Sequence, residues 1–146
     1  LCEQLVRRGV RVIWCYHRNC PVLHEGWKNQ VELCTMNGLR DKLGEVGVVV
    51  CATGAEKHVL HTGHAPFFDQ ETQTVVIDLA MPRNVAPELG GVGDSIHLLD
   101  LDDLKHWYRR EIADMAKIAE ISRATIDNHK GMYDKLINTF QGGNSG

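Results

Sequence analysis

Three short apolar runs constrain the fold of this chain more than any other feature. The runs VRVIWCY, VGVVVCA and TVVIDLA predict strands over Val10–Tyr16, Gly47–Ala52 and Val75–Leu79. Each run is too short for a typical helix and carries apolar residues on both faces, as strands do in a parallel sheet that is covered on both sides. Short helices or loops separate the runs, so we predict an α/β fold with these three as neighbouring parallel strands.

Weaker signals lie around these runs. The opening LCEQLVRRG predicts a helix that ends at Gly9, because glycine is the usual residue just beyond a helix end. A short strand is expected in QVELCT, a short helix in GLRDKLGEV and a fourth strand in SIHLLDL. Together these elements predict a partial Rossmann-like parallel sheet over residues 1–103.

A heptad pattern occupies the last third of the chain and predicts one long helix. Its seam comprises Leu104, Tyr108, Ile112, Met115, Ala119, Ser122, Ile126, His129, Tyr133, Leu136 and Phe140. Such a helix would be about 60 Å long, against a radius of gyration of ~13 Å for a domain of about 100 residues. Most of it therefore needs a partner, and we predict a helical dimerisation region over residues 104–140. The alternative is a hairpin that turns near Gly131, and residues 141–146 are predicted as a flexible tail.

Composition excludes several classes of partner. A net charge of -3 gives no electrostatic reason to expect DNA binding. No apolar run approaches the ~20 residues that cross a membrane, and we expect no signal peptide at Leu1. The five cysteines are an odd number without framework spacing, which favours a reducing, cytoplasmic setting. No Cys-x-x-Cys occurs and the eight histidines are scattered, so we predict no metal site.

Ligands of open parallel sheets bind beyond the carboxyl ends of the strands, so the residues that follow each strand are candidate site residues. After the first run come His17, Arg18 and Asn19, where an NAD-binding fold would carry an acid and a basic residue suits a 2′-phosphate. A solvated surface arginine is the alternative. After the second run come Thr53, Gly54 and Ala55, which permit close approach of a ribose or phosphate to the backbone, or simply form a tight turn.

The third run ends in Asp78 and continues as LAMPRN. A carboxylate buried near a strand end must be paired or hydrogen-bonded, and Pro82 stiffens the exit. We interpret this segment as a rigid loop aimed at the ligand crevice or at a neighbouring domain. The alternative is a structural turn held by an ion pair between Asp78 and Arg83.

Three ordered motifs, VVVCATGAEKHVL, VVIDLAMPRNVAPELGG and HLLDLDDLK, resemble glutamyl-tRNA reductase. That family reduces glutamyl-tRNA to glutamate-1-semialdehyde with NADPH in tetrapyrrole biosynthesis. The resemblance implies NADP as cofactor, a homodimer through the long helix, and glutamyl-tRNA as partner of the full-length enzyme. It also implies cofactor contacts by His17, Arg18, Asn19, Thr53, Gly54 and Ala55.

The chain departs from this family in ways that limit its predicted role. The motif of the family's nucleophilic cysteine has no counterpart, so no catalytic residue is expected in this chain. The first Rossmann strand and its Gly-x-Gly-x-x-Gly loop are missing, and Asn84 replaces the usual acid. We therefore interpret the chain as the C-terminal part of such an enzyme, not catalytic alone. The alternatives are another NADP-dependent Rossmann domain of the shikimate dehydrogenase type, or a noncatalytic dimerisation or regulatory module.

Overall fold

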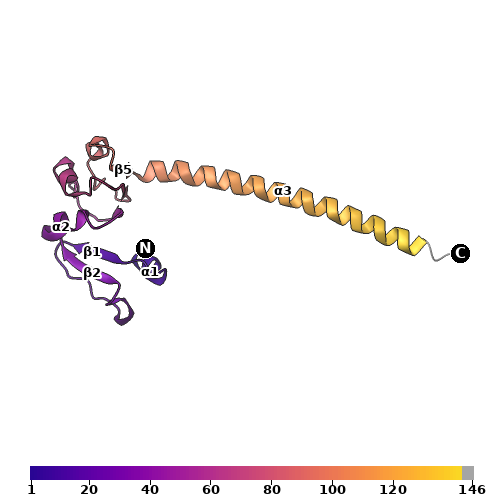
Figure 1. Ribbon diagram of the computed structural model, residues 1–146, viewed down its shortest axis with the longest axis horizontal. Helices are drawn as coiled ribbons and strands as arrows, with labels where there is room; N and C mark the ends of the chain where they lie inside the picture. Colours follow the sequence, from indigo (N-terminus) through magenta and orange to yellow (C-terminus); the bar gives the residue numbers. More distant parts are fainter. Residues whose placement is uncertain (143–146) are drawn as a thin grey trace. The chain divides into compact units, whose positions relative to one another are not determined.

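The computed structural model describes the backbone of residues 1–142 and the side chains of residues 1–124 and 127. The chain divides into two units, one over Leu1–Leu101 and one that begins at Asp102 (Figure 1). The first unit contains all five strands, and the second consists of a long helix. Each unit is described by itself below.

The first unit opens with the short helix α1 (Cys2–Arg7), which ends as its sequence predicts. Gly9 adopts a positive φ of 74°, a conformation that glycine reaches without a steric penalty. The amide of Gly9 donates to the carbonyl of Val6, and that of Val10 donates to the carbonyl of Leu5. This pair of hydrogen bonds is a Schellman motif, and it turns the chain into the first strand.

Two small parallel sheets follow. The first pairs β1 (Val12–Tyr16) with β2 (Val31–Thr35). The second has the order β3-β4-β5 and comprises β3 (Val48–Cys51), β4 (Thr74–Asp78) and β5 (Ile96–Leu99). The helix α2 (Leu39–Leu43) lies between β2 and β3 in the chain, and 3₁₀ turns occupy Glu25–Trp27, Met36–Gly38, Thr62–Phe67 and Pro87–Gly91.

Every strand pair is parallel, which confirms the α/β fold, but the predicted neighbours are partly wrong. The second and third apolar runs do pair, as β3 and β4, whereas β1 pairs with β2 and not with β3. The usual doubly wound order is 3-2-1-4-5-6, and the observed β2-β1 and β3-β4-β5 correspond to its two flanks. Among the described residues no strand occupies the central position between β1 and β3, so the two flanks form separate sheets.

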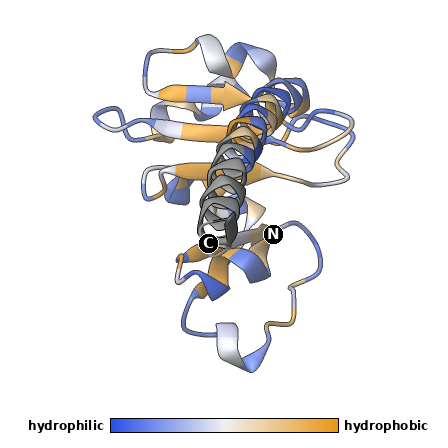
Figure 2. Cartoon of the chain, turned by 90° about the vertical axis from the view of Figure 1, so that its right-hand side faces the viewer, coloured by the Kyte–Doolittle hydropathy of each residue, from blue (hydrophilic) through white to orange (hydrophobic). Residues whose placement is uncertain are grey.

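The apolar core belongs to the second sheet and its connections. Its fully buried side chains include Leu43, Leu60, Val76, Val85 and Leu89. Figure 2 shows hydrophobic colour concentrated in the strands and hydrophilic colour in the loops. Strand β1 is less covered than the sequence predicted, because one of its edges lacks a partner strand among the described residues, and Trp14 is 38% exposed.

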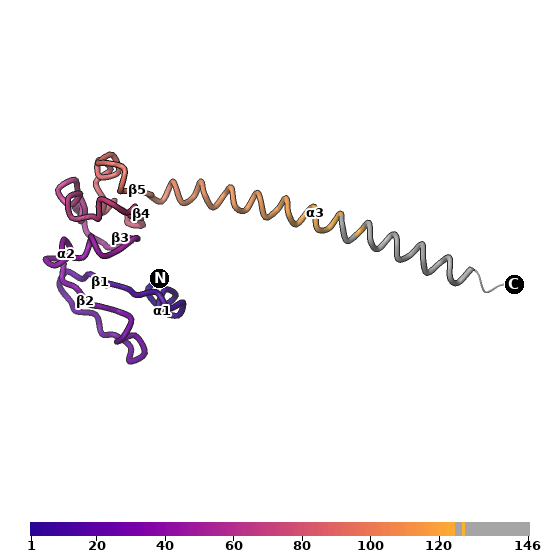
Figure 3. Tube along the Cα trace, in the orientation of Figure 1, coloured from indigo at the N-terminus to yellow at the C-terminus, as the bar shows by residue number. Residues whose placement is uncertain are grey.

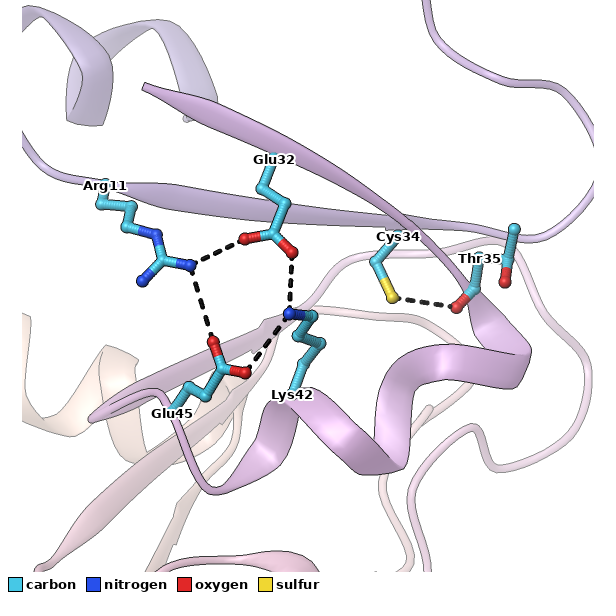
Figure 4. Close-up of polar contacts among 6 residues, drawn as sticks. All are labelled: Arg11, Glu32, Cys34, Thr35, Lys42 and Glu45. Carbon is cyan, nitrogen blue, oxygen red and sulfur yellow. Dashed lines mark hydrogen bonds and ion pairs between the residues drawn. The ribbon is translucent and has the colours of Figure 1, made fainter. Parts of the chain in front are cut away.

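A surface network of four charges joins the first sheet to α2 (Figure 4). Arg11 lies 2.7 Å from Glu32 and 3.5 Å from Glu45, and Lys42 lies 2.8 Å from Glu32 and 3.2 Å from Glu45. The carboxylates and cations therefore alternate around a ring. Because Glu45 comes shortly before β3, this ring ties the first sheet to the segment that enters the second sheet.

The second unit is the helix α3 (Leu101–Gly142), traced in Figure 3. It continues through Gly131, so the alternative of a hairpin at that residue is wrong. It also includes the first two residues of the predicted tail, while residues 143–146 lie outside the described part. The seam side chains of Ile126, His129, Tyr133, Leu136 and Phe140 lie outside the described residues as well. In the described part of the chain, no helix combines the length and apolarity needed to cross a membrane.

Candidate functional site at the strand ends

The exit of β1 presents charged and polar side chains to solvent. His17, Arg18 and Asn19 follow Tyr16 in a bend, and all three are exposed. Within the described residues their side chains form no hydrogen bond or ion pair. Residues 17–19 thus form an exposed basic segment without an acidic residue. The guanidinium of Arg18 is accessible to a ligand.

The exit of β3 is organised by hydrogen bonds to a distant side chain. The amide and the hydroxyl of Thr53 both donate to Oδ1 of Asn84, at 3.0 and 2.6 Å. The Thr53 hydroxyl oxygen also accepts from the amide of Ala55 at 3.1 Å, and Nδ2 of Asn84 donates to the carbonyl of Ala55 at 3.2 Å. Two of the three predicted loops therefore meet at Asn84.

The exit of β4 is built around the buried carboxylate of Asp78. Its Oδ1 accepts from the amide of Ala80 at 3.1 Å, and its Oδ2 accepts from the amides of Asn84 and Val85 at 2.9 and 3.0 Å. The expectation that this carboxylate is hydrogen-bonded is confirmed, and the alternative of an Asp78–Arg83 pair is wrong. A carboxylate can accept from several backbone donors of a tight loop, and here both oxygens of Asp78 accept from backbone amides.

Arg83 instead pairs with Asp100, at the end of β5. The preceding Met81–Pro82 peptide bond is cis, and Met81 is 82% exposed. The backbone carbonyl of Asn84 accepts from the amides of Val59 and Leu60. The loop after β4 is therefore attached to β5 on one side and to the segment after β3 on the other.

The cysteines at the strand ends are not activated nucleophiles. Burial, followed by the effect of Cys34, raises the pKa of the Cys15 thiol to about 11. Burial, followed by the charges of Asp78 and Cys15, raises the pKa of Cys51 to about 12. Both thiols stay protonated at neutral pH, and only the thiolate is strongly nucleophilic. Cys15 also packs against the buried cluster that contains Cys51.

Sequence reasoning missed the role of Asn84. It noted only that this residue replaces an acid, yet Asn84 has an exposed fraction of 0% and joins two loops. The sequence did carry a signal for this role: a side-chain amide, Asn84, follows the stiff exit of one strand, and a Thr-Gly turn follows another strand. In the described part of the chain, no group of three or more His, Cys, Asp or Glu side chains could hold a metal ion.

Comparison with known proteins places this geometry in a family. Residues 1–107 match the family described as shikimate / quinate 5-dehydrogenase. A glutamyl-tRNA reductase of Halobacterium salinarum is 46% identical over 74 residues, which are 51% of this chain and 16% of that protein. A second, from Nitratidesulfovibrio vulgaris, is 22% identical over 142 residues, covering 93% of this chain and 31% of that protein.

The solved glutamyl-tRNA reductase of Methanopyrus kandleri has a similar fold, with a TM-score of 0.58 and 26% identity. The match covers 87% of this chain and 35% of that one, so the chain spans only about a third of that protein. The chain therefore belongs to the family described as shikimate / quinate 5-dehydrogenase, and within it the predicted resemblance to glutamyl-tRNA reductases is confirmed.

Proposed function

We propose that the chain is the cofactor-domain and dimerisation portion of an NADPH-dependent glutamyl-tRNA reductase. In this role the strand ends bind NADP, the long helix pairs with a second copy, and the chemistry on glutamyl-tRNA requires residues outside this chain. We infer the class of reaction from the names of the relatives. We infer the cofactor from the residues at the strand ends.

The observation that carries the NADP assignment is Arg18 at the exit of β1. Strand β1 holds the place of the second strand in the doubly wound order, whose exit meets the ribose of the adenosine half of the cofactor. An acid there would bind the ribose hydroxyls of NAD, while an arginine can bind a 2′-phosphate through paired charge-assisted hydrogen bonds. Arg18 is exposed and has no acid beside it in residues 17–19. His17 and Asn19 flank it as further donors.

The Thr53–Ala55 loop forms the second part of the proposed cofactor site. Space around the Cα of Gly54 is open, since a Cβ built there meets no atom within 4 Å. The backbone can therefore approach a ribose or phosphate closely at this position. The loop also lies beside the Asp78–Asn84 exit, which holds it in place.

Catalysis by this chain alone is not part of the proposal. Reduction through a thioester needs an activated thiolate, and the thiols of Cys15 and Cys51 have raised pKa values. Cys20 is exposed but its thiol donates to the carbonyl of Pro21, and no basic side chain contacts it in the described contacts. We expect no glutamyl-tRNA turnover from the isolated chain.

Self-association through α3 follows from its exposed apolar side chains. Tyr108, Ile112 and Met115 are 61%, 47% and 67% exposed, although they fall on one seam. Contiguous apolar stripes of this kind usually mark an interface. Replacing both Ile112 and Met115 by Ala should convert a dimer to a monomer at micromolar concentration, because each buried truncation costs about 2–5 kcal/mol. The control is a Lys117→Ala, Glu120→Ala pair off the seam, and a monomeric parent in sedimentation would contradict the assignment.

The cofactor assignment is tested by titrating the protein with NADPH and NADH and following nucleotide fluorescence. The parent should prefer NADPH. Arg18→Ala should weaken NADPH binding by about ten- to a hundredfold and leave NADH nearly unchanged, since a charge-assisted fork contributes ~1.5–3 kcal/mol. Arg8→Ala removes another exposed arginine in the same unit and should change neither affinity. Equal losses for both nucleotides in Arg18→Ala would show that Arg18 does not read the 2′-phosphate.

A further inference from the structure

The side chain of Asn84 is fully buried, and each of its polar atoms bonds to the loop after β3. We propose that Asn84 is a positioning residue that holds the Thr53–Ala55 loop in its ligand-binding shape, and that Thr53 shapes this loop instead of contacting the nucleotide. The ligand-binding part of this inference rests on the proposed function, while the loop-holding part can be measured without any ligand.

The chemistry of the loop requires an amide at residue 84. Oδ1 must accept from the amide and the hydroxyl of Thr53, and Nδ2 must donate to the carbonyl of Ala55. An asparagine side chain carries an acceptor and a donor together. An ionised aspartate would keep the acceptor but would leave the Ala55 carbonyl without its partner.

Asn84 can position the loop because its own backbone is fixed from two directions. Its amide donates to the buried carboxylate of Asp78 at 2.9 Å. Its carbonyl accepts from the amide of Val59 at 2.6 Å and from that of Leu60 at 3.1 Å. Asn84 thus connects the fixed backbone after β4 to a loop that lies 31 positions earlier in the chain.

Both polar hydrogens of Thr53 are used within the protein. Its amide and hydroxyl both donate to Asn84, and its hydroxyl oxygen accepts from the amide of Ala55. Among the described residues the amide of Gly54 makes no hydrogen bond, and a Cβ built at Gly54 meets no atom within 4 Å. We therefore assign the contact with the nucleotide to the Gly54 backbone, presented by the Thr53–Asn84 hydrogen bonds.

The test uses three variants of the protein, Thr53→Ser, Thr53→Val and Asn84→Asp, in two measurements. Amide hydrogen exchange at Thr53 and Ala55, without nucleotide, reports the loop shape. Titration with NADP⁺ reports binding. Thr53 is exposed, so its two substitutions preserve folding even if the buried Asn84→Asp change does not.

Thr53→Val should speed exchange at Ala55 by about tenfold and weaken NADP⁺ binding by a similar factor, as expected when a binding-competent loop becomes a minor state. Thr53→Ser, which retains the hydroxyl, should stay within about twofold of the parent in both. Asn84→Asp should speed exchange at Ala55 and weaken NADP⁺ binding, because a carboxylate cannot donate to the Ala55 carbonyl.

Unchanged exchange at Ala55 in Thr53→Val would overturn the loop-holding role. Faster exchange with unchanged NADP⁺ affinity would overturn the link between loop shape and binding. If the parent itself fails to bind NADP⁺, the proposed function is contradicted, and the exchange rates still decide whether Asn84 and Thr53 hold the loop.

Discussion

The exits of β1 and β4 lie in the same unit but are built in opposite ways. After β4, the buried carboxylate of Asp78 and the buried amide of Asn84 use their polar atoms within the protein. After β1, Arg18 and its two neighbours are exposed, and their side chains form no described hydrogen bond. One exit is held by buried hydrogen bonds, and the other exposes its charged and polar side chains to solvent.

This difference separates two tasks that a cofactor site combines. A buried hydrogen-bonded loop fixes the position of the backbone. Each buried group that loses its partner through a substitution destabilises the protein by about 1–3 kcal/mol. An exposed arginine contributes little to stability but supplies charge for an anionic ligand. Substitutions after β4 should therefore affect stability first, whereas substitutions after β1 should, under the proposed function, affect nucleotide choice.

The largest expected effect belongs to Asp78→Ala. It leaves the amides of Ala80, Asn84 and Val85 buried without an acceptor, and should lower the free energy of unfolding by about 3–5 kcal/mol. Urea denaturation followed by circular dichroism measures the loss. Asp94→Ala, an exposed aspartate near β5, is the matched control and should change stability by under about 0.5 kcal/mol. A similar small change in Asp78→Ala would remove the contrast between the two exits.

A smaller and more selective effect is expected at Gly54. Gly54→Ala places a methyl group in open space, so stability should hold while NADPH affinity falls by about tenfold, because the methyl blocks close approach of the nucleotide. Gly47→Ala, at the opposite end of β3, also meets no atom within 4 Å and serves as the control. Equal NADPH affinities for the two variants, measured by fluorescence titration, would argue against a ligand at the β3 exit.

The smallest expected effect is on the pH dependence of stability, through His64. His64 is buried, and its Nδ1 accepts from the amide of His61 at 3.2 Å in the connection that follows β3. Burial, followed by the charges of His61 and Arg40, lowers the pKa of His64, so the folded state binds this proton less readily than the unfolded state. The contribution to stability is complete above the ordinary histidine pKa and is lost as pH falls toward the lowered folded value.

His64→Asn keeps an acceptor but cannot titrate in this range. Urea midpoints measured between pH 5 and 7 should therefore fall less steeply with acid in His64→Asn than in the parent. Parallel pH profiles for the two proteins would show that protonation of His64 does not affect folding.

The sequence was a good guide wherever its signals were local. Apolar runs predicted the strands, and Gly9 marked the end of α1, because both signals act within a few residues of the structure they specify. The sequence also predicted a basic segment at Arg18. An exposed side chain needs no distant partner, so its charge can be predicted from the sequence alone. The burial of Asp78 was predicted because the residue stands at the end of an apolar run.

What the sequence could not give was the choice between distant partners. The pairing of Asn84 with Thr53 spans 31 positions, and no pattern in either segment distinguishes it from other contacts. The sequence alone could not distinguish Arg83 from backbone amides as the partner of Asp78, because that choice depends on how the loop folds. The neighbour of β1 depends on which strand stands at the centre of the sheet, a property of the assembled sheet that no single segment encodes.

The pairing of strands that follow one another in the chain has a consequence for how each ladder forms. Each observed ladder joins strands that are consecutive in the chain, β1 with β2, β3 with β4 and β4 with β5. Parallel sheets are usually slow to form, because a central strand must wait for partners distant in sequence. Here β1 and β2 close over the single connection of residues 17–30, while β3, β4 and β5 close over two connections, so the ladder of β1 and β2 needs no strand of the second sheet to form. Folding of the first unit should then proceed in two steps, and the smaller sheet should be the first to exchange its amide protons.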